Sequence, residues 1–165
     1  MRKKVDLTIH WLEYDSADEL AKDDRELLGS AVRVLENAYA PYSMFKVGAA
    51  VRLENGEIVT GTNVENAAFP SGICAEQNAL STSASCYPGI KPVAIAIAGK
   101  AGGEPTDDPV PPCGNCRQVI AEEEGRNRHS VRIIMKGKKK IIVVEKGGDL
   151  LPIQFNKNNL RRDSL

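Results

Sequence analysis

The sequence has no excess of charge of either sign, because 22 lysines and arginines are balanced by 22 aspartates and glutamates. Nucleic acids and anionic membranes usually select a basic face, so we expect neither a nucleic-acid polymer nor a membrane as a partner. No apolar run approaches the ~20 residues that cross a bilayer. No apolar stretch follows the basic N-terminus in the manner of a secretory signal, which predicts a cytoplasmic protein.

Histidine is scarce as well, and His10 and His129 lie outside every motif. Neither histidine is needed for a zinc site, because the chain also has four cysteines. Without a secretory signal, four cysteines indicate metal-binding or catalytic thiols rather than disulfides. Cys86 has no motif around it, and we expect it to be a small buried apolar residue.

Three cysteines and one glutamate form the most informative pattern. Cys113 and Cys116 have the C-x-x-C spacing with which one helix end can grip a metal, and Cys74 comes from a separate segment with Glu76 two residues later. Three protein ligands leave the fourth tetrahedral position of Zn²⁺ open, as in catalytic zinc sites. An acid beside that position can move protons. A redox pair or a closed zinc knot is the alternative, although Cys86 lies about three helical turns from Cys74, too far to share its metal.

The order of predicted elements indicates a mixed α/β fold. The expected elements are an N-terminal strand or arm in residues 5–14, a helix opened by Asp23 and ended by Pro41, a hairpin over 48–63 turning at Asn55-Gly56, a helix over 73–86, a strand over 92–98, a helix from Cys113 stopped by Gly125, and strands over 131–135 and 141–144. The last two strands should be antiparallel, because their connection is too short for a crossover. One mixed sheet with helices on its faces is the natural assembly.

The pattern C-A-E followed by P-C-x-x-C resembles the zinc-dependent nucleobase deaminases, and most closely the small cytidine deaminases. Three further blocks carry the resemblance, at 39–50, 61–67 and 150–155, so that it covers roughly residues 24 to 155. It implies a three-layer α-β-α sandwich with one mixed five-stranded sheet. The implied domain spans 24–156, with an N-terminal extension at 1–23 and a C-terminal tail at 157–165.

The resemblance also implies a site and a reaction. Cys74, Cys113 and Cys116 would hold one Zn²⁺ per subunit, with Glu76 as the proton shuttle while hydroxide generated at the zinc attacks C4 of the base. Cytidine and 2′-deoxycytidine would become uridine and 2′-deoxyuridine with release of ammonia, in pyrimidine salvage. The implied substrate-binding residues are Phe45 on the pyrimidine, Asn63 and Glu65 on the ribose hydroxyls, and the backbone at Ala75 and Pro112 on the base. The resemblance also implies a homotetramer with sites at its subunit interfaces. Phe155 would reach into the site of a neighbouring subunit, and Phe69 resembles a residue at the same contact.

One position departs from the family pattern. Gln77 stands where an arginine usually follows C-A-E, so the positive charge that offsets three thiolates is missing there. We hypothesise that helix dipoles and Arg117 supply the difference. Another cytosine-bearing substrate, such as the nucleoside antibiotic blasticidin S, is the alternative enzyme reading, although the Asn63-x-Glu65 run favours a plain ribose. A zinc-stabilised module without catalysis would need a closed site with four ligands.

Overall fold

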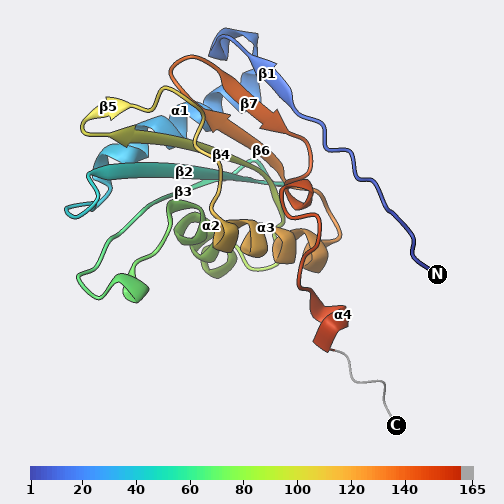
Figure 1. The fold of residues 1–165 in the computed structure, drawn as a ribbon. Helices are drawn as coiled ribbons and strands as arrows, with labels where there is room; N and C mark the ends of the chain where they lie inside the picture. The colour runs from blue at the N-terminus through green and yellow to red at the C-terminus, as the bar shows by residue number, and fades with distance from the viewer. Residues whose placement is uncertain (161–165) are drawn as a thin grey trace.

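A computed structural model describes residues 1–160 of the chain (Figure 1). Its elements are β1 (Leu12–Tyr14), α1 (Lys22–Val34), β2 (Phe45–Leu53), β3 (Ile58–Thr62), α2 (Ala75–Cys86), β4 (Pro92–Ala101), β5 (Glu104–Pro105), α3 (Gly114–Asn127), β6 (Arg132–Lys136), β7 (Ile141–Val144) and α4 (Lys157–Leu160), with 3-10 turns η1 (Ala17–Glu19), η2 (Leu35–Asn37), η3 (Phe69–Ser71) and η4 (Gly147–Leu150). The last five residues of the tail expected at 157–165 lie outside the described residues. No helix within 1–160 is long and apolar enough to cross a membrane.

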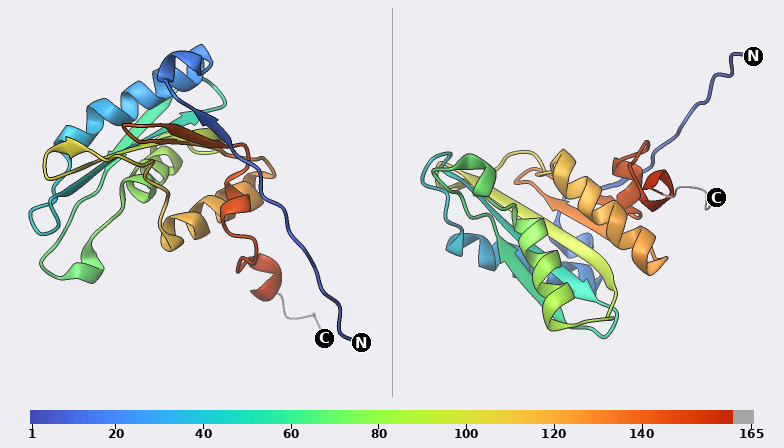
Figure 2. Two further views of the ribbon diagram at one scale, coloured as in Figure 1. Left: turned by 45° about the horizontal axis from the view of Figure 1, so that its top comes forward. Right: turned by 90° about the horizontal axis from the view of Figure 1, so that it is seen from below.

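The strands form one mixed sheet in the order β1-β7-β6-β4-β2-β3. Only the β4–β6 pair is parallel among these neighbours. Helix α1 covers one face of the sheet, and α2 and α3 cover the other (Figure 2). The expected three-layer α-β-α sandwich is therefore confirmed.

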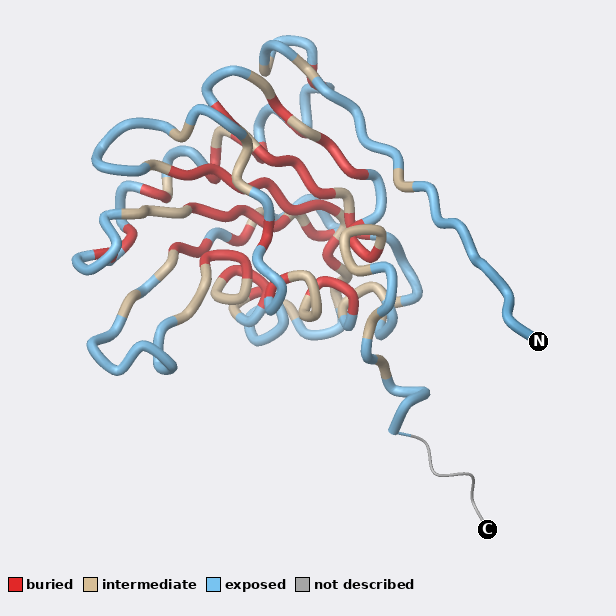
Figure 3. The backbone as a smooth tube through the Cα atoms, in the orientation of Figure 1, coloured by how far each residue is buried: buried red, intermediate tan, exposed pale blue. Residues whose placement is uncertain are grey.

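Alternation along the central strand β4 explains why both faces are covered. Ala94, Ala96 and Ala98 pack with the α1 layer, whereas Ile95 and Ile97 pack with the α2 and α3 layer. Successive side chains of a strand point to opposite faces, so a strand that is apolar on both sides needs helices on both. The buried residues follow the sheet and the inward sides of the helices (Figure 3).

The expected number of five strands is wrong, because the sheet formed by residues 1–160 has seven. One additional strand is β1, in which the N-terminal extension pairs antiparallel with β7 and Leu12 lies opposite Val143. The other is β5, two residues that turn back onto β4. Gly102 and Gly103 both have positive φ, 59° and 95°, which permits the tight two-residue turn before β5. Both additions lengthen the sheet without changing its layers.

The hairpin and the antiparallel β6–β7 pair are confirmed, but three helix boundaries differ from expectation. Helix α1 stops short of Pro41: it ends at Val34, and the 3-10 turn η2 continues it only to Asn37. Helix α1 begins at Lys22 without a side-chain cap, so the capping pattern at Asp23 does not open it. Helix α3 continues past Gly125 and ends before Arg128, which adopts the left-handed conformation. Asn127 stabilises this last turn, because its Nδ2 donates to the Glu123 carbonyl at 2.9 Å.

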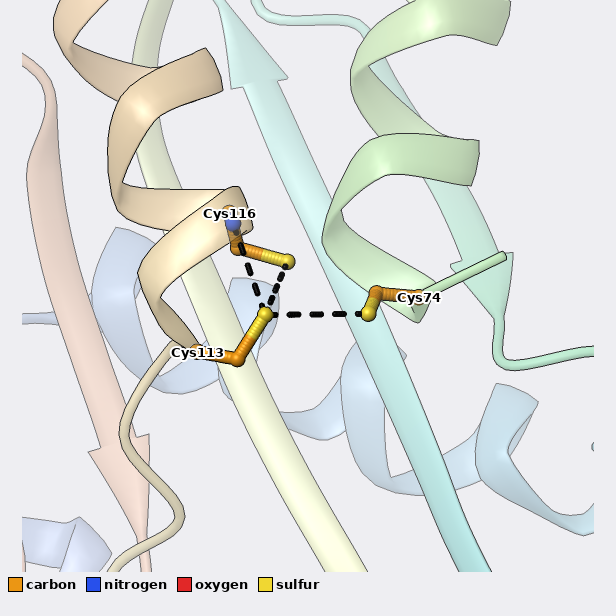
Figure 4. Close-up of side chains that lie close together, drawn as sticks. All are labelled: Cys74, Cys113 and Cys116. Carbon is orange, nitrogen blue, oxygen red and sulfur yellow. Dashed lines mark hydrogen bonds between the residues drawn. The ribbon is translucent and has the colours of Figure 1, made fainter. Parts of the chain in front are cut away.

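Close packing of α2 on the sheet brings its N-terminus to the site. Gly61 of β3 faces α2, and a Cβ there would lie 2.5 Å from the Ala79 backbone nitrogen. Any larger residue would push the helix away. Helices α2 and α3 lie side by side on this face of the sheet, and Cys74 and Cys113 cap their N-termini (Figures 1 and 4).

Candidate metal centre and substrate pocket

Three cysteine sulfurs meet where α2 and α3 begin (Figure 4). Cys74 is the N-cap residue of α2, Cys113 is the N-cap residue of α3, and Cys116 lies in the first turn of α3. The Sγ atoms of Cys74 and Cys113 are 3.8 Å apart, those of Cys113 and Cys116 are 3.5 Å apart, and all three lie within 4.8 Å of one another. Tetrahedral zinc with Zn–S bonds of about 2.3 Å requires sulfurs about 3.8 Å apart. The spacing of the thiols therefore fits one zinc ion.

The environment of these thiols lowers the pKa of Cys74, so that its thiolate, the form that binds a cation, is favoured. Hydrogen bonding with the neighbouring Cys116 thiol lowers the pKa of Cys74 to about 6. The same interaction, seen from the donor, raises the pKa of Cys116 above its ordinary range. One thiolate thus forms readily near neutral pH while its neighbour keeps a proton. The partial positive charge of two helix N-termini favours this thiolate, and a bound cation would favour the remaining two.

Glu76 lies in the first turn of α2, beside the three sulfurs, and is 5% exposed. Burial raises the pKa of its carboxyl, whereas hydrogen bonding with the Cys116 thiol partly opposes that rise. A buried carboxyl with a raised pKa can both accept and release a proton near neutral pH. The structure therefore places a group able to transfer protons next to the predicted metal ligands.

The cluster has three ligands in the described part of the chain. Among residues 1–160, Cys74, Cys113 and Cys116 are the one group of three or more histidine, cysteine or acidic residues whose ligand atoms converge. Cys86 lies at the far end of α2 and is exposed, so the expectation that it would be buried is wrong. Cys86 therefore cannot serve as the fourth cysteine of a closed, four-ligand zinc site. Three ligands match an open, catalytic type of zinc site.

Gln77 and Arg117 follow the predicted metal ligands in the first turns of α2 and α3. The Nε2 atom of Gln77 is buried and has no hydrogen-bond partner within residues 1–160. The Nε of Arg117 donates to the Pro112 carbonyl at 2.8 Å, and its Nη1 donates to the Leu150 carbonyl at 3.2 Å. Arg117 thus holds the loop that delivers Cys113, and its bonds go to carbonyl oxygens rather than to sulfur. Its charge still lies on the first turn of α3.

A cavity of about 530 Å³ opens beside the thiol cluster. Cys74 forms part of its wall, and the predicted ribose-binding residues Asn63 and Glu65 line it too. The complete lining is Tyr42, Ser43, Asn63, Val64, Glu65, Asn66, Phe69, Gly72, Ile73 and Cys74. The structure therefore brings Cys74 and the predicted ribose-binding residues to one pocket, and all three belong to the connection between β3 and α2.

The side chain of Asn63 ties the ends of two strands together. Its Oδ1 accepts a hydrogen bond from the Val47 backbone N–H at 2.7 Å, and its Nδ2 donates to the Phe45 carbonyl at 2.9 Å. An amide has two donor hydrogens and two acceptor lone pairs, so each end keeps capacity for a ligand. Asn63 therefore has a structural role that the sequence did not reveal, alongside its predicted one.

Glu65 is held in a similar way. Its Oε2 accepts hydrogen bonds from the backbone N–H groups of Tyr42 at 2.8 Å and of Ser43 at 3.2 Å. Hydrogen bonding from the Ser43 side chain, supported by these two N–H groups, holds the pKa of the carboxyl below its ordinary value. Glu65 is therefore ionised at neutral pH and presents an acceptor to the cavity.

The other predicted substrate-binding residues do not line this cavity. Phe45 begins β2, where its carbonyl accepts the Asn63 bond, and Ala75 and Pro112 flank the cysteines. Phe155 is 58% exposed, and its carbonyl accepts a hydrogen bond from Gln118 Nε2 at 2.7 Å, which anchors the C-terminal segment to α3. Its ring is thus presented outward from the chain that carries it.

Sequence reasoning missed Tyr42 as part of the pocket. Its ring meets Phe69 edge to face, with centroids 5.9 Å apart and planes at 71°. Tyr42 lies in the 39–50 block and Phe69 lies two residues after the 61–67 block, so their pairing depends on the fold. Both rings are largely exposed, at 52% and 75%. They form an apolar rim beside the predicted ribose-binding residues.

Fold and site together define a class of protein. A mixed α/β sandwich here carries three thiols at two helix N-termini, a buried carboxyl beside them and a pocket of small-molecule size. These parts are what a metal-dependent hydrolytic enzyme requires.

The comparison with protein families narrows this class. Residues 21–129 match the family model described as the cytidine and deoxycytidylate deaminase zinc-binding region. That match covers more than half of the chain, and the chain belongs to this family. The predicted resemblance is confirmed, as is zinc as the cofactor that fits the three-cysteine group.

Individual relatives agree with the family assignment. A cytidine deaminase of Sporosarcina psychrophila is 37% identical over 139 residues, which is 84% of this chain and 95% of the relative. A cytidine deaminase of Mycobacterium tuberculosis is 35% identical over 140 residues, or 83% and 92% of the two chains. The crystal structure of cytidine deaminase from Burkholderia pseudomallei is similar with a TM-score of 0.68 and 37% identity, covering 79% of this chain and 97% of that one.

Proposed function

We propose that this chain is a zinc-dependent cytidine deaminase, which hydrolyses cytidine and 2′-deoxycytidine to uridine and 2′-deoxyuridine and releases ammonia. The observation that carries the proposal is the position of Glu76, buried beside three sulfurs that lie within 4.8 Å of one another. The family match and the relatives named cytidine deaminase support the same reaction. The proposed reaction belongs to pyrimidine salvage in the cytoplasm. The free cysteines fit that compartment, where thiols stay reduced.

Cys74, Cys113 and Cys116 are the residues that would hold the zinc. When bound, zinc supplies Lewis-acid activation of a water molecule at neutral pH. Hydrogen bonding with the Cys116 thiol lowers the pKa of Cys74 to about 6, which favours the thiolate form that a metal requires. Cys116 is buried and Cys74 lines the cavity, so a substrate in the cavity would approach the metal-holding residues from the side of Cys74.

Glu76 carries the protons of the reaction. Its carboxylate accepts a proton from the attacking water and delivers it to N3 of the pyrimidine while the oxygen adds to C4. It then takes the remaining hydroxyl proton and delivers it to the amino group, which leaves C4 as ammonia while the C4 carbonyl forms. Burial raises the pKa of Glu76, which brings its affinity for a proton toward that of the groups it serves.

The remaining predicted residues bind the nucleoside. Asn63 and the ionised Glu65 line the cavity and offer hydrogen bonds to ribose hydroxyls. Phe45 would pack on the pyrimidine, with the backbone at Ala75 and Pro112 contacting the edge of the base.

The cavity lining favours a nucleoside over a nucleotide. Among the residues that line it in the described part of the chain there is no lysine or arginine, and Glu65 is ionised. A 5′-phosphate would meet no cation there and would be repelled by this carboxylate.

The quaternary proposal is a homotetramer with sites at subunit interfaces. The exposed rings of Tyr42 and Phe69 beside the cavity, and the outward Phe155 on its anchored segment, support it. Phe155 of one subunit would cover the cavity of another. Sedimentation would show a four-chain particle for the domain itself, and a single-chain mass would remove this part of the proposal.

The decisive experiment follows the absorbance of cytidine as it is converted to uridine. We expect turnover by the zinc-loaded protein and a loss of about 10³-fold in kcat for Glu76→Gln, which removes the proton shuttle. Zinc content should stay at one per chain in that variant. Glu104→Gln, the same substitution on the exposed strand β5, is the matched control and should be unchanged.

Other outcomes separate the alternatives. Turnover of blasticidin S without turnover of cytidine would assign another cytosine-bearing substrate. No turnover of either compound by fully zinc-loaded protein would favour the non-catalytic zinc module.

A further inference from the structure

The first eleven residues form an arm that leaves the domain (Figures 1 and 2). Only Leu12–Tyr14 pair with β7, and residues 1–10 form no backbone hydrogen bond within the described chain, 1–160. Figure 3 shows the arm as exposed along nearly its whole length. The family match begins at residue 21, so the arm lies outside the deaminase domain proper.

The arm has the sequence of a strand with one apolar face. Every second residue from Val5 to Trp11 is large and apolar, and the residues between them are polar. The four apolar positions are Val5, Leu7, Ile9 and Trp11. In an extended chain these side chains lie on one side. Val5 is 78% exposed and Leu7 is 67% exposed, so this face is uncovered in the single chain.

The arm also continues an open edge of the sheet. Strand β1 is the last strand at one end of the sheet. One edge of β1 pairs with β7, and its other edge has no neighbouring strand within residues 1–160. Glu13 in β1 is fixed by Lys140, whose Nζ lies 3.2 Å from its carboxylate. Strand β1 therefore offers its outer edge, and the arm offers both of its edges, to another extended segment.

We propose that the arms of two copies of this chain pair as antiparallel strands around a two-fold axis at Thr8. Such a pairing is self-complementary, as an interface between identical subunits must be. Each residue then lies opposite the one equally far from Thr8 in the partner. Odd-numbered residues stay opposite odd-numbered residues, so the apolar sides of both arms share one face of the ribbon.

Most of the pairs that this register creates are favourable. Opposite residues are Lys3 and Glu13, Val5 and Trp11, Asp6 and His10, and Leu7 and Ile9, whereas Lys4 opposite Leu12 is a pair without a favourable contact. Opposite charges and aromatic–aliphatic pairs facing each other across strands stabilise a ribbon, whereas like charges destabilise it. The arm has its basic residues at the start, Arg2 to Lys4, and the acidic Glu13 and Asp15 at the end. An antiparallel pair brings these unlike ends together.

Other registers are worse. An axis at Ile9 would place Glu13 opposite Val5, and an axis at Leu7 would place Lys3 opposite Trp11. An axis between two residues would turn the apolar sides of the two arms to opposite faces. Charge and hydrophobicity therefore select Thr8 together.

The two domains have room in this arrangement. The two Glu13 residues would be ten strand positions apart, about 33 Å at the usual rise per residue. An isolated two-stranded ribbon is only marginally stable, but this ribbon continues the seven-stranded sheet of each copy through β1. The inference does not depend on the proposed deaminase activity.

Disulfide trapping of the full-length, zinc-loaded protein tests the register. In a Cys86→Ser background, which removes the exposed native thiol away from the cluster, Thr8→Cys places two cysteines directly opposite each other. Opposite Cα atoms in antiparallel strands are about 4.5 to 5.5 Å apart, within the range for a disulfide. Lys4→Cys is the control, because its two copies would be about 26 Å apart.

We expect disulfide-linked dimers of Thr8→Cys to form at least about tenfold faster than those of Lys4→Cys at low micromolar concentration, since only Thr8 satisfies the distance limit. Adding Lys3→Glu to Thr8→Cys should slow trapping roughly threefold, because it places like charges opposite each other. Lys4→Glu carries the same change in net charge without facing Glu13 and should have a smaller effect. Equal trapping at positions 8 and 4, or none at either, would overturn the proposal.

Discussion

The two halves of the pocket are built on different principles. The metal half stands on the first turns of α2 and α3, where Cys116 is fully buried and Glu76 is 5% exposed. The substrate half stands on loops between 42 and 73, with Tyr42 at 52% and Phe69 at 75% exposed. Helices that pack on a sheet hold the first half, whereas side-chain hydrogen bonds to backbone hold the second.

This difference shows how function is distributed over the fold. The metal half can be formed within one chain, because its ligands sit on rigid elements with a shared core. The substrate half has two anchors, Asn63 and Glu65, whose hydrogen bonds shape the loop and which also line the cavity. Substitution in the metal half should therefore act through metal binding and chemistry, while substitution of the anchors in the substrate half should affect folding and substrate binding together.

The largest effect is expected from Cys116→Ser. A serine hydroxyl is a poor zinc ligand, so the three-thiolate site becomes a two-thiolate site and loses its metal. We expect zinc content near zero by elemental analysis and no measurable deamination. Cys86→Ser makes the same substitution at an exposed position and should keep both. Full zinc occupancy of Cys116→Ser would contradict the assignment of this ligand.

A smaller effect on two properties is expected from Asn63→Ala. The substitution removes the partners of the Val47 N–H and the Phe45 carbonyl, which should cost about 1–3 kcal/mol in the free energy of unfolding. It also removes a predicted ribose contact, so kcat/KM for cytidine should fall. Urea unfolding and steady-state kinetics measure the two effects separately.

Asn66→Ala is the matched control for stability. Asn66 lines the same cavity, but its Oδ1 accepts only the local N–H of Ala68 at 2.8 Å. Its loss should cost less than that of Asn63. If Asn63→Ala weakened substrate binding and left the unfolding free energy unchanged, the two halves of the pocket would not differ in the way described.

The same division explains what the sequence could predict. The grouping of the metal half could be predicted, because Cys74 with Glu76 and Cys113 with Cys116 form two short motifs of local spacing, and the family resemblance implied that these two motifs meet. The layers and the β6–β7 pairing followed from apolar patterning and loop length. The family resemblance also pointed to Asn63 and Glu65.

The rest depends on contacts between distant segments. The pairing of Tyr42 with Phe69 and the hydrogen bonds that Asn63 makes to β2 appear only when the hairpin and the loop after it are folded. The strand number was wrong for a related reason. Residues 5–14 alternate throughout, but only Leu12–Tyr14 meet a partner in β7, and nothing local distinguishes those three residues from the rest.

The smallest effect is expected from Gln77→Arg, which adds a positive charge to the metal half. Gln77 Nε2 is buried without a hydrogen-bond partner within residues 1–160, and Arg117 donates to carbonyl oxygens. A positive charge at position 77 should therefore act on the neighbouring Glu76 carboxyl. Burial raises the pKa of Glu76, and a nearby guanidinium favours the ionised carboxylate. The acidic limb of the kcat/KM profile should therefore move to lower pH by roughly half a unit to one unit. Gln77→Met is the control, because methionine is uncharged and similar in size to glutamine, and it should leave the acidic limb in place. Both variants should be compared at equal zinc content. An unchanged profile in Gln77→Arg would mean that the helix N-termini and Arg117 already balance the charge of the thiolates.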